Sequence, residues 1–315
     1  MSTPESTTIA FIGTGVMGAP MAGHLMDAGY PVVVFNRTPA RAESLIQRGA
    51  TWAEAPGAAA ALADVVITMV GYPADVEAVY LGEDGIVASA KPGALLIDMT
   101  TSSPILAERI AVAAAARGLR ALDAPVSGGD IGAKNAKLTI MVGGDVADFS
   151  AAEAILRVMG ANVVLQGGPG AGQHTKMANQ VAIAGCMLAT VESLSYAEAA
   201  GLNPRTVLES IGAGSAASWS LVNLAPRILD GNFAPGFFVK HFVKDMRIAM
   251  DSATEMGVDL PGLATAKRLY ELLEASGGEN LGTQALWLLY ADDAAREASG
   301  VSPTATTRAA TAAGA

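Results

Sequence analysis

The stretch Gly13-Thr14-Gly15-Val16-Met17-Gly18 decides the fold of this chain. It joins an apolar run, residues 8–12, to a helix-like segment, residues 19–29, and so predicts a strand, a tight turn and a helix. The first glycine allows the tight turn, the second leaves room for a pyrophosphate, and the third lets helix and strand pack closely. A second β-branched run, residues 32–35, follows at the spacing of a βαβ unit. We call residues 13–18 the fingerprint loop and expect it to bind a dinucleotide at the helix N-terminus.

The three residues after that second run are Asn36, Arg37 and Thr38. A site for NAD places an Asp or Glu here to bind the ribose 2′-hydroxyl, whereas a site for NADP carries a cation. Arg37 can pair a 2′-phosphate through two parallel hydrogen bonds, and Asn36 and Thr38 can donate to it as well. The alternative is that Arg37 is a solvated turn residue. The missing acid and the present base together favour NADP as the cofactor, with NAD as the other possibility.

The composition of the chain narrows its class. Its 315 residues suffice for two domains and a large core. The formal net charge of −10 argues against a nucleic-acid surface, and one cysteine with three histidines gives neither a disulfide framework nor a metal site. The longest uncharged helical stretch, residues 177–191, is too short to span a bilayer, and residues 1–6 lack the features of a secretory signal. We therefore expect a cytoplasmic protein with no metal, no nucleic-acid partner and no membrane partner.

Strand and helix patterns alternate up to a glycine-rich link at residues 167–172, and helical patterns alone follow it. This predicts an α/β fold: a Rossmann-like dinucleotide-binding domain over residues 1–167, an all-α domain over residues 168–297 and a disordered tail over residues 298–315. Further strands are expected at residues 65–70, 94–98, 120–122, 137–142 and 163–166. Helices are expected at residues 40–49, 75–80, 105–117, 147–159, 173–200, 204–211, 221–229, 240–256, 264–273 and 283–297.

Loops that follow the strands of such a sheet face the ligand, so Val70 and Gly71 should lie near the cofactor. Thr101 lies in a hydroxyl-rich stretch, residues 99–104, which is expected to cap the next helix. Thr101 can also contact the nicotinamide end of the cofactor, and the two roles are compatible. Residues 123–129, the substrate loop, have the sequence Asp-Ala-Pro-Val-Ser-Gly-Gly and are expected to be a loop at a strand end. The amides of Ser127, Gly128 and Gly129 can form a small anion-binding concavity for a substrate carboxylate; an ordinary glycine-rich turn is the alternative.

Lys176 and Asn179 are three residues apart near the start of the long helix, and so lie on one face. Hydride transfer between a nicotinamide and a hydroxyl or carbonyl carbon requires a proton to move on the oxygen. A lysine ammonium can donate that proton and a neutral amine can accept it. Because a free lysine titrates near ~10.4, this role requires burial. Asn179 can hold the lysine or the substrate, whereas a solvated surface lysine is the commoner alternative.

Four stretches together resemble the β-hydroxyacid dehydrogenase family, which contains 3-hydroxyisobutyrate dehydrogenase and tartronate semialdehyde reductase. They are the fingerprint loop, the substrate loop, residues 170–180 and the pair Lys244-Asp245, in this order over nearly the whole chain. The resemblance implies a Rossmann-like domain followed by an all-α domain, assembled as a homodimer or homotetramer. It implies Lys176 as the acid/base catalyst, Ser127, Gly128, Gly129 and Asn179 as substrate-binding residues, and Val70, Gly71, Thr101 and Lys244 as cofactor contacts. Gly71 departs from the proline that the family often has there.

We therefore expect an NADP-dependent oxidoreductase that reduces a small aldehyde acid, a semialdehyde, to its hydroxy acid, or catalyses the reverse. Imine reductases look similar and also carry Asn-Arg-Thr after the second strand, but they generally lack the lysine. Enzymes of phosphogluconate decarboxylation have a much longer helical half. A non-catalytic NADP-binding protein is a further alternative, and the related non-catalytic domains have usually lost the lysine.

Overall fold

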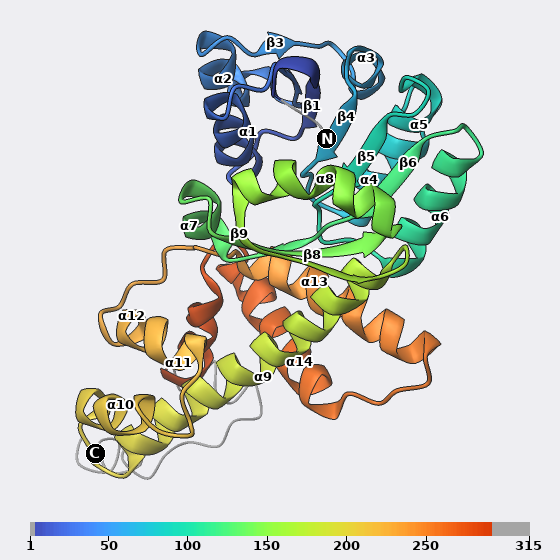
Figure 1. Cartoon of the computed structure of the whole chain (residues 1–315). Coiled ribbons are helices and arrows are strands. Elements are labelled where there is room, and N and C mark those ends of the chain that lie inside the picture. The colour runs from blue at the N-terminus through green and yellow to red at the C-terminus, as the bar shows by residue number, and fades with distance from the viewer. Residues whose placement is uncertain (1–3, 292–315) are drawn as a thin grey trace. The chain divides into compact units, whose positions relative to one another are not determined.

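The computed structural model describes residues 4–291 (Figure 1). The chain forms two compact units, the first ending at Met177 and the second beginning at Ala178, within the long helix α9 (Ala171–Ala199). Because the division between the two units falls within one continuous helix, it does not test the domain limits predicted above, at residues 167 and 168. Those limits stay predictions. The two units are described separately.

The first unit contains a nine-stranded sheet within the described residues. Its strands are β1 (Ile9–Ile12), β2 (Val32–Phe35), β3 (Thr51–Trp52), β4 (Val65–Thr68), β5 (Leu95–Asp98), β6 (Arg120–Asp123), β7 (Val126–Ser127), β8 (Leu138–Gly144) and β9 (Gly160–Gly167). They lie in the order β3-β2-β1-β4-β5-β6-β8-β7, with β9 on β8. The first six are parallel, whereas β8 runs antiparallel to β6 and β7. This six-strand order is that of dinucleotide-binding folds, and it reverses direction between β1 and β4.

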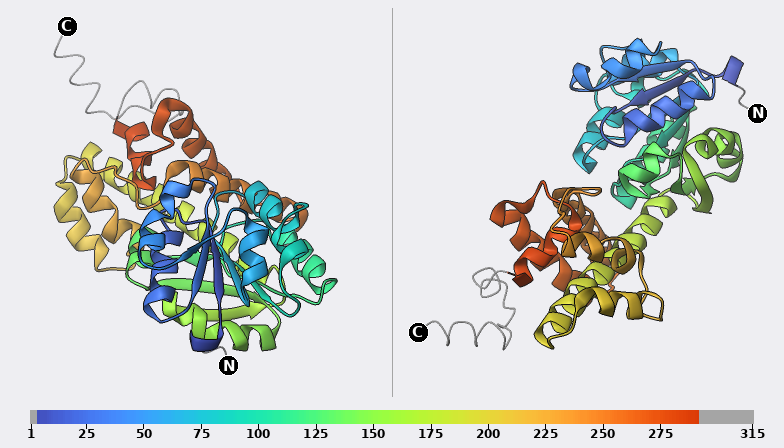
Figure 2. Two further views of the ribbon diagram at one scale, coloured as in Figure 1. Left: turned by 90° about the horizontal axis from the view of Figure 1, so that it is seen from above. Right: turned by 90° about the vertical axis from the view of Figure 1, so that its left-hand side faces the viewer.

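Helices cover both faces of this sheet (Figure 2). One face carries α1 (Gly18–Asp27), α2 (Glu43–Gln47), α7 (Gly129–Lys134) and α8 (Val146–Met159), and the other α3 (Pro56–Leu62), α4 (Pro73–Leu81), α5 (Ile86–Ser89) and α6 (Pro104–Ala115). Successive residues of a strand point to opposite faces, so Phe11 packs on the first face and Ile12 on the second. Because both faces are covered, β1, β4 and β5 are buried throughout. The predicted α/β, Rossmann-like class is confirmed.

The second unit is helical over its described residues, apart from one isolated bridge between Phe238 and Gly282. It contains most of α9, then α10 (Pro204–Gly212), α11 (Trp219–Asn223), α12 (Ala225–Leu229), α13 (Val239–Glu255), α14 (Pro261–Leu273), η3 (Glu274–Gly278), η4 (Thr283–Trp287) and α15 (Leu288–Ala291). Phe242 of α13 meets Tyr270 of α14 edge to face, with ring centroids 5.0 Å apart. The Tyr270 hydroxyl donates to the Thr283 carbonyl at 2.7 Å, so the aromatic core is also tied to η4.

Several predicted elements differ in the structure. Residues 40–49 form a 3-10 turn, η2 (Pro39–Arg41), and then the short α2, rather than one helix. The predicted helix over residues 221–229 is divided at Leu224 into α11 and α12, since Pro226 has no N–H for a continuous helix. Strand β3 and helices α5 and α7 were not predicted, because each has six residues or fewer and little periodicity.

The prediction that residues 123–129 form a loop was also wrong in part, because this segment contains a short strand. Val126 and Ser127 form β7 against Ile140 and Thr139. Pro125 lacks an N–H, but its carbonyl accepts from the Met141 amide at 3.0 Å, so the proline does not prevent pairing. Of the predicted helix over residues 283–297, the described part is η4 and α15. The remainder and the tail at residues 298–315 lie outside the described residues.

Helix α9 is long and apolar enough to cross a membrane by length and composition, contrary to the sequence prediction. The prediction counted one uncharged run, which ends before Glu192, whereas the helix continues to Ala199. The core helix of a soluble protein passes the same test, so this feature alone does not favour a membrane location.

Candidate functional site

The three glycines of the fingerprint loop have different surroundings. Gly13 has φ +98°, and a Cβ there would overlap the carbonyl oxygen of Met69, just after β4. A Cβ on Gly18 would overlap the carbonyl of Gly13. A Cβ on Gly15 would meet nothing within 4 Å. The outer glycines therefore allow close packing, and the middle one leaves the open surface that a bound pyrophosphate requires, next to the point where the strand order reverses.

Asn36 connects the fingerprint loop to the end of β2. Its Oδ1 accepts from the Thr14 amide at 3.0 Å, and its Nδ2 donates to the Thr38 carbonyl at 2.9 Å. The side chain that we expected to meet a 2′-phosphate thus holds three of the predicted cofactor residues together. The Thr14 Oγ1 is buried and has no hydrogen-bond partner among the described residues. A buried hydroxyl of this kind usually finds a partner, and a bound dinucleotide would supply one.

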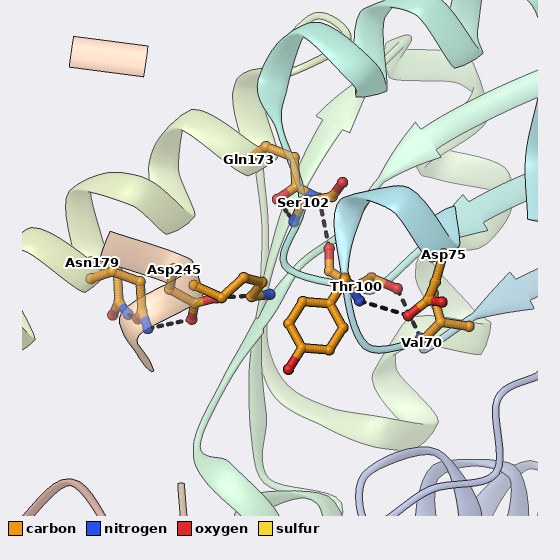
Figure 3. A network of polar contacts seen from close by, with 10 residues as sticks. Val70, Asp75, Thr100, Ser102, Gln173, Asn179 and Asp245 are labelled. Carbon is orange, nitrogen blue, oxygen red and sulfur yellow. Dashed lines mark hydrogen bonds and ion pairs between the residues drawn. The ribbon is translucent and has the colours of Figure 1, made fainter. Parts of the chain in front are cut away.

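Arg37 lies beside an acid that the sequence analysis missed. Its Nη1 is 3.2 Å from the Asp75 Oδ1, and its side chain is 86% exposed. The Asp75 Oδ2 accepts from the Tyr72 amide at 3.2 Å at the start of α4, so the carboxylate is held in place (Figure 3). The guanidinium has five N–H donors, so this pair leaves donors for a phosphate. Gly71 is close by, because a Cβ there would be 3.2 Å from the Asp75 Oδ2.

Hydrogen bonds join the ends of β4 and β5. The Val70 amide donates to the Thr100 Oγ1 at 3.0 Å (Figure 3). The Asp98 Oδ1 accepts from the Thr100 amide at 3.0 Å and from the Thr68 Oγ1 at 2.7 Å. Burial raises the pKa of Asp98 to about 6, whereas these hydrogen bonds act in the opposite direction. The loop that carries Val70 is therefore fixed to the loop that carries Thr101.

Gln173, in the first turn of α9, binds this second loop. Its Nε2 donates to the Thr100 carbonyl at 2.7 Å and its Oε1 accepts from the Ser102 amide at 2.9 Å, so both ends of a fully buried amide are used (Figure 3). Thr101 lies between these two contacts. Ser103 caps α6, with its Oγ 3.5 Å from the Leu106 amide, so the expected cap is present. The role of Thr101 stays a prediction.

Lys176 lies on α9 three residues after Gln173, and it is 6% exposed. Its burial is the condition that the acid/base role required. In the substrate loop, Ser127 ends β7, and Gly128 and Gly129 have φ +127° and +62°. Side chains rarely adopt such conformations, so both glycines are needed to turn the chain from β7 into α7.

In the second unit, a chain of polar contacts connects two predicted site residues. The Asn179 Nδ2 donates to the Gln180 Oε1 at 2.6 Å, and the Gln180 Nε2 donates to the Asp245 Oδ2 at 2.7 Å (Figure 3). The Lys244 Nζ lies 2.8 Å from the Asp245 Oδ1. Asp245 is 2% exposed, and a buried carboxylate of this kind is costly unless it is paired. Gln180 and Asp245 were not predicted as site residues, although the Lys-Asp pair was visible in the sequence.

The fold and these residues define a Rossmann-type enzyme that uses a dinucleotide. The strand order places the fingerprint loop at the switch point, and Gly15 leaves space there. A buried lysine, Lys176, lies near the start of α9. Two family models match the chain: the NAD binding domain of 6-phosphogluconate dehydrogenase over residues 8–168, and the NAD-binding region of NADP-dependent 3-hydroxyisobutyrate dehydrogenase over residues 170–290. The chain belongs to the β-hydroxyacid dehydrogenase family and is an NAD(P)-dependent oxidoreductase.

Similar proteins cover nearly the whole chain. A probable 3-hydroxyisobutyrate dehydrogenase-like protein of Arabidopsis thaliana is 50% identical over 91% of this chain and 86% of its own length. The 2-hydroxy-3-oxopropionate reductase of Escherichia coli is 37% identical over 88% of this chain and 95% of its own. The Mycobacterium tuberculosis 3-hydroxyisobutyrate dehydrogenase with L-serine is similar in structure, with a TM-score of 0.83, 33% identity, and coverage of 90% of this chain and 98% of that one.

Two further structures bear on the cofactor and on the imine alternative. Psf3 in complex with NADP+ and 2-OPP has a TM-score of 0.82 and 25% identity, covering 90% of this chain and 99% of that one. An imine reductase from Pseudomonas sp. has a TM-score of 0.59 and 22% identity, covering 91% and 99%. At 22% identity, the similarity to the imine reductase shows a shared fold only.

Proposed function

We propose that the protein is an NADP-dependent reductase of a small aldehyde acid, a semialdehyde, which forms the hydroxy acid or catalyses the reverse reaction. The observation that carries this proposal is the burial of Lys176 on α9, three residues after the glutamine that binds the loop of Thr101. The similar E. coli protein is named as a reductase of 2-hydroxy-3-oxopropionate, which is itself an aldehyde acid.

The residues predicted to act on the substrate each have a chemical task in this proposal. When bound, the nicotinamide supplies or takes the hydride at the reacting carbon. Lys176 donates a proton to the carbonyl oxygen during reduction and accepts it during oxidation. Ser127 and the amides of Gly128 and Gly129 bind the substrate carboxylate. Asn179, whose amide is oriented by Gln180, holds the substrate.

The preference for NADP rests on Arg37. It follows β2 at the position where an NAD site carries an acid, and its exposed guanidinium is open to a 2′-phosphate. The Asp75 carboxylate comes from α4, so it can orient Arg37 without occupying the place of the acid that binds a ribose hydroxyl. NAD remains the second cofactor that we propose to test.

The first experiment follows nicotinamide absorbance with NADPH and with NADH. Each is mixed with succinic semialdehyde, glyoxylate, methylmalonate semialdehyde or 2-hydroxy-3-oxopropionate. Propanal, an aldehyde without a carboxylate, is the matched control, and a cyclic imine tests the alternative reaction. We expect an aldehyde acid to oxidise NADPH faster than NADH, and propanal to react poorly. Turnover of the imine alone would contradict the role of Lys176. Binding of NADPH with no turnover of any compound would favour the non-catalytic alternative.

We also propose that the enzyme is cytoplasmic and forms a homodimer or homotetramer. Support for assembly comes from large apolar side chains on the second unit, since Tyr196 and Trp219 are 76% and 68% exposed. Large apolar side chains that gather on one exposed face are commonly covered by a partner, and these two are the candidates that the proposed assembly would cover. Sedimentation equilibrium measures the mass directly, and a monomer at micromolar concentration would contradict this part of the proposal.

A further inference from the structure

The N-terminus of α9 is capped by a residue far away in the sequence. The residue before the helix, Gly170, has φ +85° and no side chain with which to cap. The carboxylate of Asp123, the last residue of β6, takes this place. Its Oδ1 accepts from the Gly170 amide at 2.8 Å, and its Oδ2 accepts from the Gln173 amide at 2.7 Å. A carboxylate in this position satisfies helix amides that would otherwise be unpaired and interacts favourably with the helix dipole.

Two glycines make room for this carboxylate. A Cβ on Gly143 of β8 would be 2.5 Å from the Asp123 Oδ1, and a Cβ on Gly172 of α9 would be 2.8 Å from the Oδ2. Asp123 is 4% exposed, and burial raises its pKa, while the hydrogen bonds from Gly170 and Gln173 act in the opposite direction. The structure thus keeps an acid in a closely packed interior, where burial disfavours its charged form. Backbone amides at the start of α9 offset that cost.

The position of Asp123 in the chain connects two parts of the proposed active site. It is the first residue of the substrate loop, four residues before Ser127, and its carboxylate holds the start of the helix that carries Lys176. We propose that Asp123 is a positioning residue that sets Lys176 relative to Ser127, Gly128 and Gly129. Lys176 lies only about 4.5 Å along the helix axis from Gln173, so a displaced helix start displaces the amine. The inference rests on the proposed acid/base role of Lys176.

The test is Asp123→Asn, which keeps the shape and one acceptor oxygen but turns an NH2 group toward one of the two amides. Because burial already disfavours the charge of Asp123, we expect the variant to fold. A misplaced catalytic group can cost about 10²-fold, so kcat should fall by about 10- to 100-fold, with KM for NADPH changed less than about threefold. The pH profile of kcat should also shift, because the surroundings of the lysine have changed.

The matched control is Asp145→Asn in the same unit. The Asp145 Oδ1 caps α8 by accepting from the Ala147 amide at 2.7 Å, but α8 carries none of the proposed site residues. We expect this variant to keep the kcat and the pH profile of the wild type. If Asp123→Asn does not fold, Asp123→Glu, which keeps the charge but is one methylene longer, replaces it and should lower kcat in the same way.

Lys176→Met, measured in parallel, separates the two proposals. If Lys176→Met is inactive and Asp123→Asn keeps the kcat and pH profile of the wild type, the positioning inference is wrong and the proposed function stands. If Asp123→Asn and Asp145→Asn lower kcat equally with unchanged pH profiles, the role of Asp123 is only structural and the inference is overturned. If Lys176→Met keeps full turnover, both proposals are wrong.

Discussion

The fingerprint loop and the start of α9 both depend on glycines and on backbone amides, but their partners lie at different distances along the chain. Gly18 packs against Gly13, five residues earlier, and the Thr14 amide binds Asn36, 22 residues later. At the start of α9, Asp123 is 47 and 50 residues from the amides that it binds. Gln173 is 71 and 73 residues from its partners on the loop after β5. The first region is specified locally, and the second forms only when the sheet is assembled.

Lys176→Met should have the largest effect, and it tests whether the second region serves catalysis at all. Methionine keeps the length and the apolar stem of the buried side chain but cannot move a proton. General acid/base groups contribute about 10²–10⁴-fold, so kcat should fall by about 10³-fold while NADPH binding, followed by fluorescence, is unchanged. Lys134→Met, at an exposed ion pair with Asp130 on α7, is the matched control and should keep full activity. A kcat above a tenth of the wild-type value for Lys176→Met would contradict the acid/base role.

This difference between the regions also explains what the sequence could predict. The glycines at positions 13, 15 and 18 lie within six residues, next to a clear strand, so their roles follow from spacing alone. Lys176 was a candidate because of its place near the start of the long helix, and the resemblance favoured its acid/base role, but its burial became visible only in the structure. Asp123 was visible as the start of the substrate loop, but its capping role depends on a contact across 47 residues. No periodic pattern records such a contact, and Asp75 beside Arg37 was missed for the same reason.

Gln173→Leu should have the next largest effect, on stability. It leaves the Thr100 carbonyl and the Ser102 amide buried without their partner, and each such loss costs about 1–3 kcal/mol. We expect the free energy of unfolding, measured in urea, to fall by about 3 kcal/mol. Gln166→Leu on β9 is the control, because its amide is exposed and the surface substitution should change stability by less than about 0.5 kcal/mol. Equal effects would mean that the long-range contacts of α9 are not what stabilises this region.

Asp98→Asn tests the carboxylate that binds the Thr100 amide, in the same loop that Gln173 binds. The quantity measured is the pH dependence of stability. Burial raises the pKa of Asp98 from 3.8 to about 6, so the folded state holds the proton more tightly than the unfolded state. The resulting stabilisation is fully present below about pH 4 and is lost as the pH rises through about 6. Asparagine cannot ionise, so between pH 4 and 7 the wild type should lose about 2 kcal/mol relative to the variant. A constant difference over this range, measured by urea unfolding, would show that Asp98 does not titrate there.

Gly15 and Gly18 provide a test within the local region. In Gly18→Ala the added methyl group would overlap the Gly13 carbonyl oxygen, so the ligand-free protein should lose about 2 kcal/mol of stability. Gly15→Ala points its methyl into open space, so stability should change little. That methyl group occupies the surface proposed for the pyrophosphate, and the Kd for NADPH should rise about tenfold. Thermal unfolding and NADPH fluorescence measure the two effects separately. A loss of stability without a loss of binding in Gly15→Ala would mean that the pyrophosphate lies elsewhere.

Arg37→Ala should have the smallest effect, and it tests a pair that is intermediate between the two regions, since Asp75 lies 38 residues away. The side chain is exposed and its ion pair with Asp75 contributes little to stability, so the unfolding midpoint should not change. A lost charge-assisted contact to a 2′-phosphate should lower kcat/KM for NADPH by about tenfold, while kcat/KM for NADH changes less than about twofold.

Arg41→Ala on η2 is the control, because it removes a nearby exposed arginine without altering the residues that follow β2. Equal losses with both cofactors would mean that Arg37 does not bind the phosphate. The ion pair of Arg37 with Asp75, which joins the segment after β2 to α4, would then be a structural contact only.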